Sequence, residues 1–181
     1  MDELDVDSLL KKVRKGDAEA LAVLCEYFYP QVLKYMYYRA DAASAEDLTG
    51  EVFLRVLRHI GEQSGSFIAW LYRIAANVVT DYARTGKIRQ KGQTNKQLTK
   101  STVDSKNPAD AVGRHIDIYN AIVRLTDDQR ELITLKFIQG LSNADVAEIT
   151  GRSEGAIRGL QFRALSALRF ILSGEEKAHE H

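Results

Sequence analysis

The feature that most constrains the fold is the loss of helical periodicity between residues 85 and 108. This tract is rich in Lys, Thr, Ser, Asn and Gln, and its apolar residues are isolated. It cannot bury enough surface to offset the entropy cost of ordering it. On either side, apolar residues recur at the spacing of amphipathic helices, and no segment has a convincing strand pattern. We therefore predict an all-α protein with two small helical domains joined by a flexible basic linker.

The predicted boundaries follow from this break. The first domain covers residues 1–86, the linker residues 87–110, the second domain residues 111–174 and a frayed tail residues 175–181. In the first domain we expect helices near residues 6–15, 18–29, 30–38, 44–60 and 66–84. Pro30 is expected to start a new helix, since proline suits a first turn. Ser44, three residues before Asp47, has the form of an N-terminal cap.

The helix expected over residues 66–84 has two distinct faces. Its apolar stripe, with Trp70 at the edge, consists of Phe67, Leu71, Ile74, Val78 and Tyr82. A second, narrow face consists of Arg73, Asn77, Thr80 and Arg84. Guanidinium groups bind phosphates, amides contact base edges, and aromatic rings stack on unpaired bases. This face is either a nucleic-acid surface or an ordinary solvated face, while Asp81 is expected to be a structural partner.

The second domain has the spacing of a helix-turn-helix. A T-x-x-Q capping box at Thr126 opens one helix, and two further helices, capped by Ser142 and Ser153, are separated by a turn containing Gly151. The last helix should bury Ile157, Leu160, Ala164, Leu168 and Ile171. Its other surface consists of Gly155, Arg158, Gly159, Phe162, Arg163 and Ser166, with Arg152 and Ser153 at its N-terminus. Exposed glycines and arginines favour close approach to duplex DNA, and the alternative is a plain helical bundle.

Composition excludes several functional classes. The formal net charge is zero, but seven basic residues and one acid lie between residues 84 and 106, so basic surfaces are local. The chain has no run of 18 apolar residues and starts with an acidic segment unlike a signal peptide, so we expect a cytoplasmic protein. One cysteine and four scattered histidines, two of them His179 and His181 in the tail, suggest no metal site. We expect no cofactor and no enzymatic activity.

Two blocks of the sequence resemble bacterial RNA polymerase sigma factors. These blocks are AEDLTGEVFLRVLRHI with FIAWLYRIAANVVTDYAR, and LTDDQRELITLKFIQGLSNADVAEITGRSEGAIRGLQFRALSALR. Their order and the linker between them are similar to the two-domain extracytoplasmic-function (ECF) group. The resemblance implies a promoter-specificity subunit that binds RNA polymerase core, through the beta-prime clamp and the beta flap, and promoter DNA in both duplex and single-stranded form. An anti-sigma factor is a further expected partner.

The resemblance also implies roles for individual residues. Core polymerase would be bound by Asp47, Glu51 and Leu54. The minus-10 element would be bound by Trp70, Arg73, Asn77, Thr80 and Arg84, and an extruded base by the loop over residues 59–66. The minus-35 element would be bound by Arg152, Ser153, Arg158, Gly159, Phe162 and Arg163. Gly50, Gly159 and Leu160 depart from the family pattern, so base specificity should differ. Two alternatives stay open: a dimeric helix-turn-helix regulator, and an adaptor that only occupies polymerase.

Overall fold

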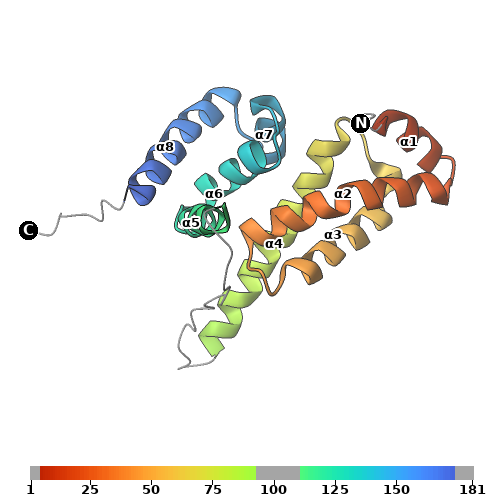
Figure 1. Cartoon of the computed structure of the whole chain (residues 1–181). Helices are drawn as coiled ribbons and strands as arrows, with labels where there is room; N and C mark the ends of the chain where they lie inside the picture. Colours follow the sequence, from red (N-terminus) through yellow and green to blue (C-terminus); the bar gives the residue numbers. More distant parts are fainter. Residues whose placement is uncertain (1–4, 93–110, 174–181) are drawn as a thin grey trace, which may run out of the picture.

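The computed structural model describes residues 5–92 and 111–173, and all regular elements in these ranges are helical (Figure 1). The first unit consists of α1 (Val6–Val13), α2 (Ala18–Arg39), α3 (Ala45–His59), the short 3-10 helix η1 (Ile60–Glu62) and α4 (Phe67–Gly92). The second consists of α5 (Ala111–Val123), α6 (Asp127–Ile133), the π-helical turn η2 (Thr134–Ile138), α7 (Asn143–Thr150) and α8 (Glu154–Leu172). The all-α prediction is confirmed.

An apolar core among α2, α3 and α4 holds the first unit together. Val32, Tyr35 and Met36 of α2 are fully buried, as are Val52 of α3 and Leu71 of α4. Burying one large apolar side chain stabilises a fold by about 1.5–3 kcal/mol. This packing therefore decides which face of α4 points outward, and the outward face carries Arg73 and Asn77.

Pro30 does not begin a helix, so that prediction is wrong. α2 continues through Pro30 without a break. An internal proline removes one backbone hydrogen bond and costs about 3 kcal/mol. Pro30 and Glu26, whose carbonyl loses its partner, are both exposed, so water can satisfy that carbonyl. The buried stripe continues on the other side of the helix through Phe28 and Val32, and its packing offsets the local cost.

Two further expectations about the first unit need correction. α3 begins after Ser44 as predicted, but the Ser44 side chain makes no capping hydrogen bond. Its hydroxyl lies 2.8 Å from the Tyr82 hydroxyl on α4, a tertiary contact that replaces the local cap. α4 extends to Gly92, six residues past the predicted domain end at residue 86. The rest of the predicted linker and the predicted tail lie outside the described residues.

The second unit is built on local signals that the sequence shows clearly. Ser142 accepts a hydrogen bond from the Asp145 amide (3.1 Å), and Ser153 accepts one from the Ala156 amide (3.2 Å). Gly151, with φ of 67°, adopts the left-handed conformation that ends α7. The core of the second unit contains Ile122, Leu132, Leu135, Val146 and Ile157. The helix starts predicted from Ser142 and Ser153 are confirmed.

The two units also contact each other. Tyr72 of α4 is 1% exposed, and its hydroxyl donates to Oε1 of Gln139, just after η2, at 2.8 Å. The Gln139 side-chain amide in turn donates to the Gln31 carbonyl of α2 (3.1 Å). Arg39, at the end of α2, donates to the Asp127 carbonyl at the start of α6 (3.1 Å). The helix-turn-helix unit therefore packs on α2 and α4, and Figure 1 shows α6 and α7 on that side.

Candidate nucleic-acid interface

The predicted minus-10 face lies on α4, on the surface that its packing leaves outward. Arg73, Asn77, Thr80 and Arg84 are all exposed. Trp70 is half-buried, with its ring centroid 5.8 Å from that of Phe67. The core thus anchors one side of the indole while four polar side chains follow along the helix.

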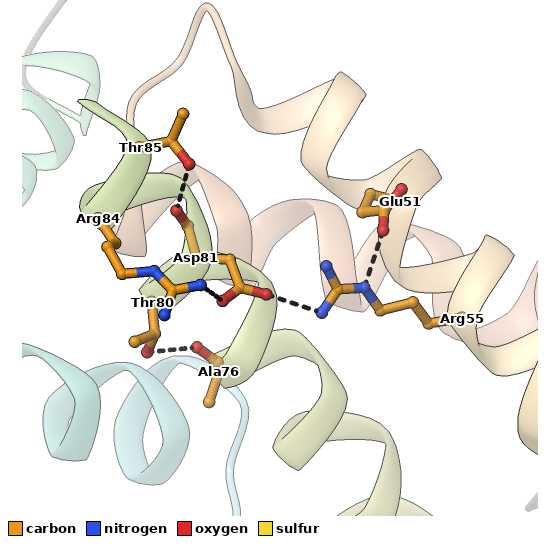
Figure 2. Close-up of polar contacts among 7 residues, drawn as sticks. All are labelled: Glu51, Arg55, Ala76, Thr80, Asp81, Arg84 and Thr85. Carbon is orange, nitrogen blue, oxygen red and sulfur yellow. Dashed lines mark hydrogen bonds and ion pairs between the residues drawn. The ribbon is translucent and has the colours of Figure 1, made fainter. Parts of the chain in front are cut away.

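Asp81 links this face to α3, as Figure 2 shows. Its carboxylate accepts from Arg55 of α3 at 3.1 Å and lies 3.5 Å from the Arg84 guanidinium. Arg55 also donates to Glu51 at 2.8 Å. The hydrogen bond from Arg55 to Glu51, and the one to Asp81, raise the pKa of Arg55 above its ordinary value although partial burial opposes this. The predicted structural role of Asp81 is confirmed.

Thr80 and Arg73 have partners in this structure that bear on their availability. The Thr80 hydroxyl donates to the Ala76 carbonyl of its own helix (2.9 Å), so that hydrogen is not free for a ligand (Figure 2). Arg73 donates to the Glu148 carbonyl of α7 at 3.2 Å and lies 3.7 Å from the Glu148 carboxylate. The second unit therefore contacts Arg73, one of the arginines predicted to bind DNA.

Thr80 and Arg84 also line a cleft of about 560 Å³ between α2, α4 and α6. Its other charged lining residues include Arg39, Arg130 and Glu131. Burial raises the pKa of Glu131 above its ordinary value, and nearby Asp128 acts in the same direction; Arg39, Arg152 and Tyr35 oppose it. The cleft carries both signs of charge, so it lacks the uniform positive potential expected of a phosphate site.

The loop before α4 covers residues 60–66 and has a defined conformation. Gln63 is 3% exposed, and its side-chain amide donates to the Gly65 carbonyl at 2.8 Å. Gly65 has φ of 71°, a conformation that favours glycine. The Ser66 hydroxyl accepts the Ala69 amide hydrogen (3.2 Å) and so caps α4. No local sequence pattern indicated that Gln63 would be buried.

The predicted polymerase-binding residues lie along α3. Asp47 is exposed, Leu54 is 49% exposed, and Glu51 is half-buried and paired with Arg55. Leu57 is also exposed, at 48%, one turn after Leu54. The sequence analysis did not name Leu57 on this face of α3, although its i+3 spacing from Leu54 was visible in the sequence.

The helix-turn-helix presents α8 with a surface of mixed polar and apolar character. Phe162 is 75% exposed, and Arg158 and Arg163 are also exposed. Gly159 is half-buried, and a Cβ built there would lie 3.7 Å from the Arg163 guanidinium. An aromatic ring this open to water suits apolar contact with a base edge, and the neighbouring arginines suit phosphates or base edges.

The N-terminus of α8 is fixed by its own capping contacts. Ser153 caps the helix, and Arg152 forms an ion pair with Asp128 of α6 at 2.7 Å. Arg158 lies 3.7 Å from Glu154 one turn earlier. Arg152 thus ties the start of α8 to α6. The structure brings all six predicted minus-35 residues together on α8 and the two residues that precede it.

Two other site types are not found in the described part of the chain. Among these residues no group of three His, Cys, Asp or Glu side chains is placed to hold a metal ion. None of the helices described there is long and apolar enough to cross a membrane.

The arrangement matches known proteins in both units. Residues 24–88 match the sigma-70 region 2 family, and residues 115–168 match the sigma-70 region 4 family. The chain is 33% identical over 169 residues to the ECF RNA polymerase sigma factor SigC of Mycobacterium tuberculosis, covering 92% of this chain and 91% of SigC. The chain belongs to the ECF RNA polymerase sigma factors. These proteins direct RNA polymerase to promoters.

Other relatives extend this comparison. This sigma factor is 38% identical over 176 residues to the ECF sigma factor BldN of Streptomyces coelicolor, covering 93% of this chain and 66% of BldN. Two solved structures share its fold, each with a TM-score of 0.70. One is CnrH in complex with the cytosolic domain of CnrY, at 20% identity, covering 95% of this chain and all of that one. The other is RpoE of Bartonella quintana in complex with the anti-sigma factor NepR, at 22% identity, covering 88% and 100%.

Proposed function

We propose that this sigma factor brings core RNA polymerase to promoters by dividing recognition between α4 and α8. The observation that carries the proposal is that one chain holds both matched regions, each with an exposed helix face bearing two or more arginines. The chemistry of transcription belongs to the polymerase, so the protein itself supplies DNA recognition and no catalytic group. It acts in the cytoplasm, where core polymerase and DNA are available.

At the minus-10 element, α4 would hold unpaired bases of one strand. Asn77 is exposed, and its side-chain amide can donate to and accept from a base edge, while the half-buried Trp70 would offer the face of its ring for stacking. Arg73 and Arg84 would hold phosphates. Thr80 would contribute its oxygen as an acceptor, because its hydrogen is donated to Ala76.

At the minus-35 element, α8 would enter the major groove of duplex DNA. Phe162 would contact an apolar group such as a thymine methyl, and Arg158 and Arg163 would bind guanine edges or phosphates. Gly159 would allow close approach of the groove wall. Substitution of Arg158 by Ala should cost about 1–3 kcal/mol at one base position if the side chain contacts a base, and should act on all sequences alike if it holds a phosphate.

Core polymerase would bind to α3. We assign the beta-prime clamp to Asp47, Glu51 and Leu54, with the exposed Leu57 extending the apolar part of the surface. The second unit would contact the beta flap. Because RpoE has been solved with the anti-sigma factor NepR, a partner of the same class is proposed for this chain as well.

Promoter binding would require the two units to separate. The Arg73 guanidinium is held against α7 by its donation to the Glu148 carbonyl, and α7 stands against α4 beside the proposed strand-binding face. Minus-10 and minus-35 elements lie apart along a promoter, so one compact body would not span them. The packed arrangement is therefore proposed to be the form that exists before DNA is bound.

The deciding experiment is transcription in vitro from a genomic fragment library with purified core polymerase, with and without the protein. New and discrete start sites that require the protein would support the proposal. Specific duplex binding by the protein alone as a dimer, without new starts, would favour a helix-turn-helix regulator. Tight core binding without any promoter opening would favour an adaptor.

A pair of matched variants tests the minus-10 assignment. Asn77→Ala should reduce promoter opening. The fold should be retained because Asn77 is exposed, and affinity for core polymerase should be unchanged because the proposed polymerase surface lies on α3. Asn120→Ala removes the same side chain from the exposed surface of α5 and should have no effect. Normal initiation by Asn77→Ala would show that the strand-binding face lies elsewhere.

A further inference from the structure

A contact joins the end of α1, which lies outside the part of the chain that matches region 2, to the loop before α4, which lies inside that part. Arg14 follows α1, and the matched segment begins at residue 24. One guanidinium nitrogen of Arg14 donates to both the side-chain oxygen of Gln63 (3.0 Å) and its backbone carbonyl (3.1 Å). Figure 1 shows α1 beside the connection between α3 and α4.

Gln63 is the centre of this loop because all of its polar groups have partners within hydrogen-bond distance. Its backbone amide donates to the Ile60 carbonyl (3.3 Å), its side-chain amide donates to the Gly65 carbonyl (2.8 Å), and both of its oxygens accept from Arg14. A buried amide without partners would cost free energy, so these contacts keep Gln63 inside and hold the loop around it. Arg14 supplies both contacts that come from another element.

The buried Gln63 determines what the loop presents to the outside. Residues 61, 62, 64 and 65 are exposed around it, and Ser66 starts α4 by capping Ala69. The loop therefore reaches directly into the helix that carries Trp70 and Arg73. A change in the position of Gln63 would move the exposed residues relative to that helix, without any change in the helix itself.

We infer that Arg14 is a positioning residue that sets base selectivity at the minus-10 element by holding the loop of residues 60–66 through Gln63. This inference rests on the proposed function of α4 and on the expectation that the loop binds an extruded base. Arg14 does not touch DNA in this role. It acts on the shape of the loop, so it should affect which base is preferred rather than whether polymerase is bound.

The test uses holoenzyme reconstituted from core polymerase and the full chain, with promoters randomised across both elements. Arg14→Ala should reduce the preference at one or two adjacent minus-10 positions by about two- to tenfold, the size expected from one or two lost hydrogen bonds. Preference at the minus-35 element and affinity for core should be unchanged. Arg14→Lys, which keeps one donor nitrogen, should restore part of the preference.

Two further variants separate positioning of the loop from simple attraction of DNA by positive charge. Lys15→Ala removes the same charge from the next residue and should leave base preference unchanged. If it acts like Arg14→Ala, attraction of DNA by charge is responsible and the inference is wrong. Gln63→Met fills a similar buried volume with a side chain that accepts no strong hydrogen bond from Arg14, and it should alter the same promoter positions as Arg14→Ala.

The outcomes also distinguish this inference from the proposed function. If the unsubstituted protein yields no promoter-specific starts with core polymerase, the proposed function fails. If it does initiate, but Arg14→Ala and Gln63→Met select bases as it does, the inference fails while the function stands. A melting curve for each variant identifies a temperature at which all variants are folded. If Arg14→Ala does not fold, the base preference of Gln63→Met tests the inference instead.

Discussion

The packing of the two units predicts a measurable effect of one hydroxyl group. Tyr72 of α4 donates to Gln139 of the second unit at 2.8 Å, from a side chain that is 1% exposed. Tyr72→Phe removes only this hydroxyl. The ring, whose centroid lies 5.4 Å from that of Tyr35, keeps its packing within the first unit. The substitution therefore weakens the contact between the units and leaves the core of each in place.

The size of the effect follows from the contact that is lost. A neutral hydrogen bond contributes about 0.5–1.5 kcal/mol net, which corresponds to a shift of about two- to thirteenfold in an equilibrium at room temperature. Gln139 is half-buried and keeps its bond to the Gln31 carbonyl. We expect the ratio of packed to separated units to decrease by a factor in this range, because the hydroxyl of Tyr72 pairs with Gln139 only when the units are packed.

Energy transfer between two dyes measures that ratio directly. In a Cys25→Ser background, dyes are attached through Glu46→Cys on α3 and Ser166→Cys on α8, both of which are exposed positions. Tyr72→Phe should shift the population toward the separated form. It should also speed open-complex formation by the corresponding holoenzyme if separation precedes DNA binding.

Tyr82→Phe is the matched control. The Tyr82 hydroxyl donates to Asp41 at 2.8 Å, a contact confined to the first unit. Its loss should lower the melting temperature without changing energy transfer between the dyes. Equal transfer in Tyr72→Phe and the unsubstituted protein would refute the reasoning, because the contact would then contribute nothing to the packing of the units in solution.

Three other predictions concern single side chains. Gly159→Ala should stabilise α8 by up to about 1 kcal/mol, since the new Cβ meets only Arg163 at ordinary contact distance. It should also weaken binding of the holoenzyme to the minus-35 element, and unchanged binding would contradict a close approach of DNA to Gly159. Glu131→Gln should raise the melting temperature more at pH 7 than at pH 4. Burial raises the pKa of Glu131, so the contribution of its protonated form to stability is present at low pH and is lost as pH rises through that raised value. Equal shifts in melting temperature at the two pH values would contradict this. Asp81→Ala should destabilise the chain by about 0.2–1 kcal/mol for each partly exposed ion pair removed, measured by chemical denaturation, and no loss would mean that the pairs with Arg55 and Arg84 contribute nothing.

Much of the local structure was predictable because its causes are local. Ser142 and Ser153 cap their helices as predicted, and Gly151 ends α7 in a conformation that few other residues adopt. Each of these contacts lies within a few residues along the chain, so the sequence contains both partners side by side. The exposed positions of Arg158 and Phe162 follow in the same way from the period of the helix.

The misses concern contacts between residues far apart in the sequence. Pro30 lies inside α2 because the core stabilises the continuous helix by more than the lost hydrogen bond costs. The Ser44 hydroxyl contacts the hydroxyl of Tyr82, 38 residues away, instead of capping α3. No local pattern contains such a partner, and the preference of a short segment is overruled when packing supplies a larger free energy.

The sequence by itself determined the helical class, the helix ends in the second unit and the faces on which the DNA-binding candidates lie, because periodicity and capping are properties of neighbouring residues. Only the tertiary structure decided which residues from distant parts of the chain those faces and the loop contact. It placed Glu148 against Arg73 and brought Arg14 to Gln63 across 49 residues. Such pairings depend on how whole helices pack, and the free energy of that packing is a property of the folded core rather than of any one segment.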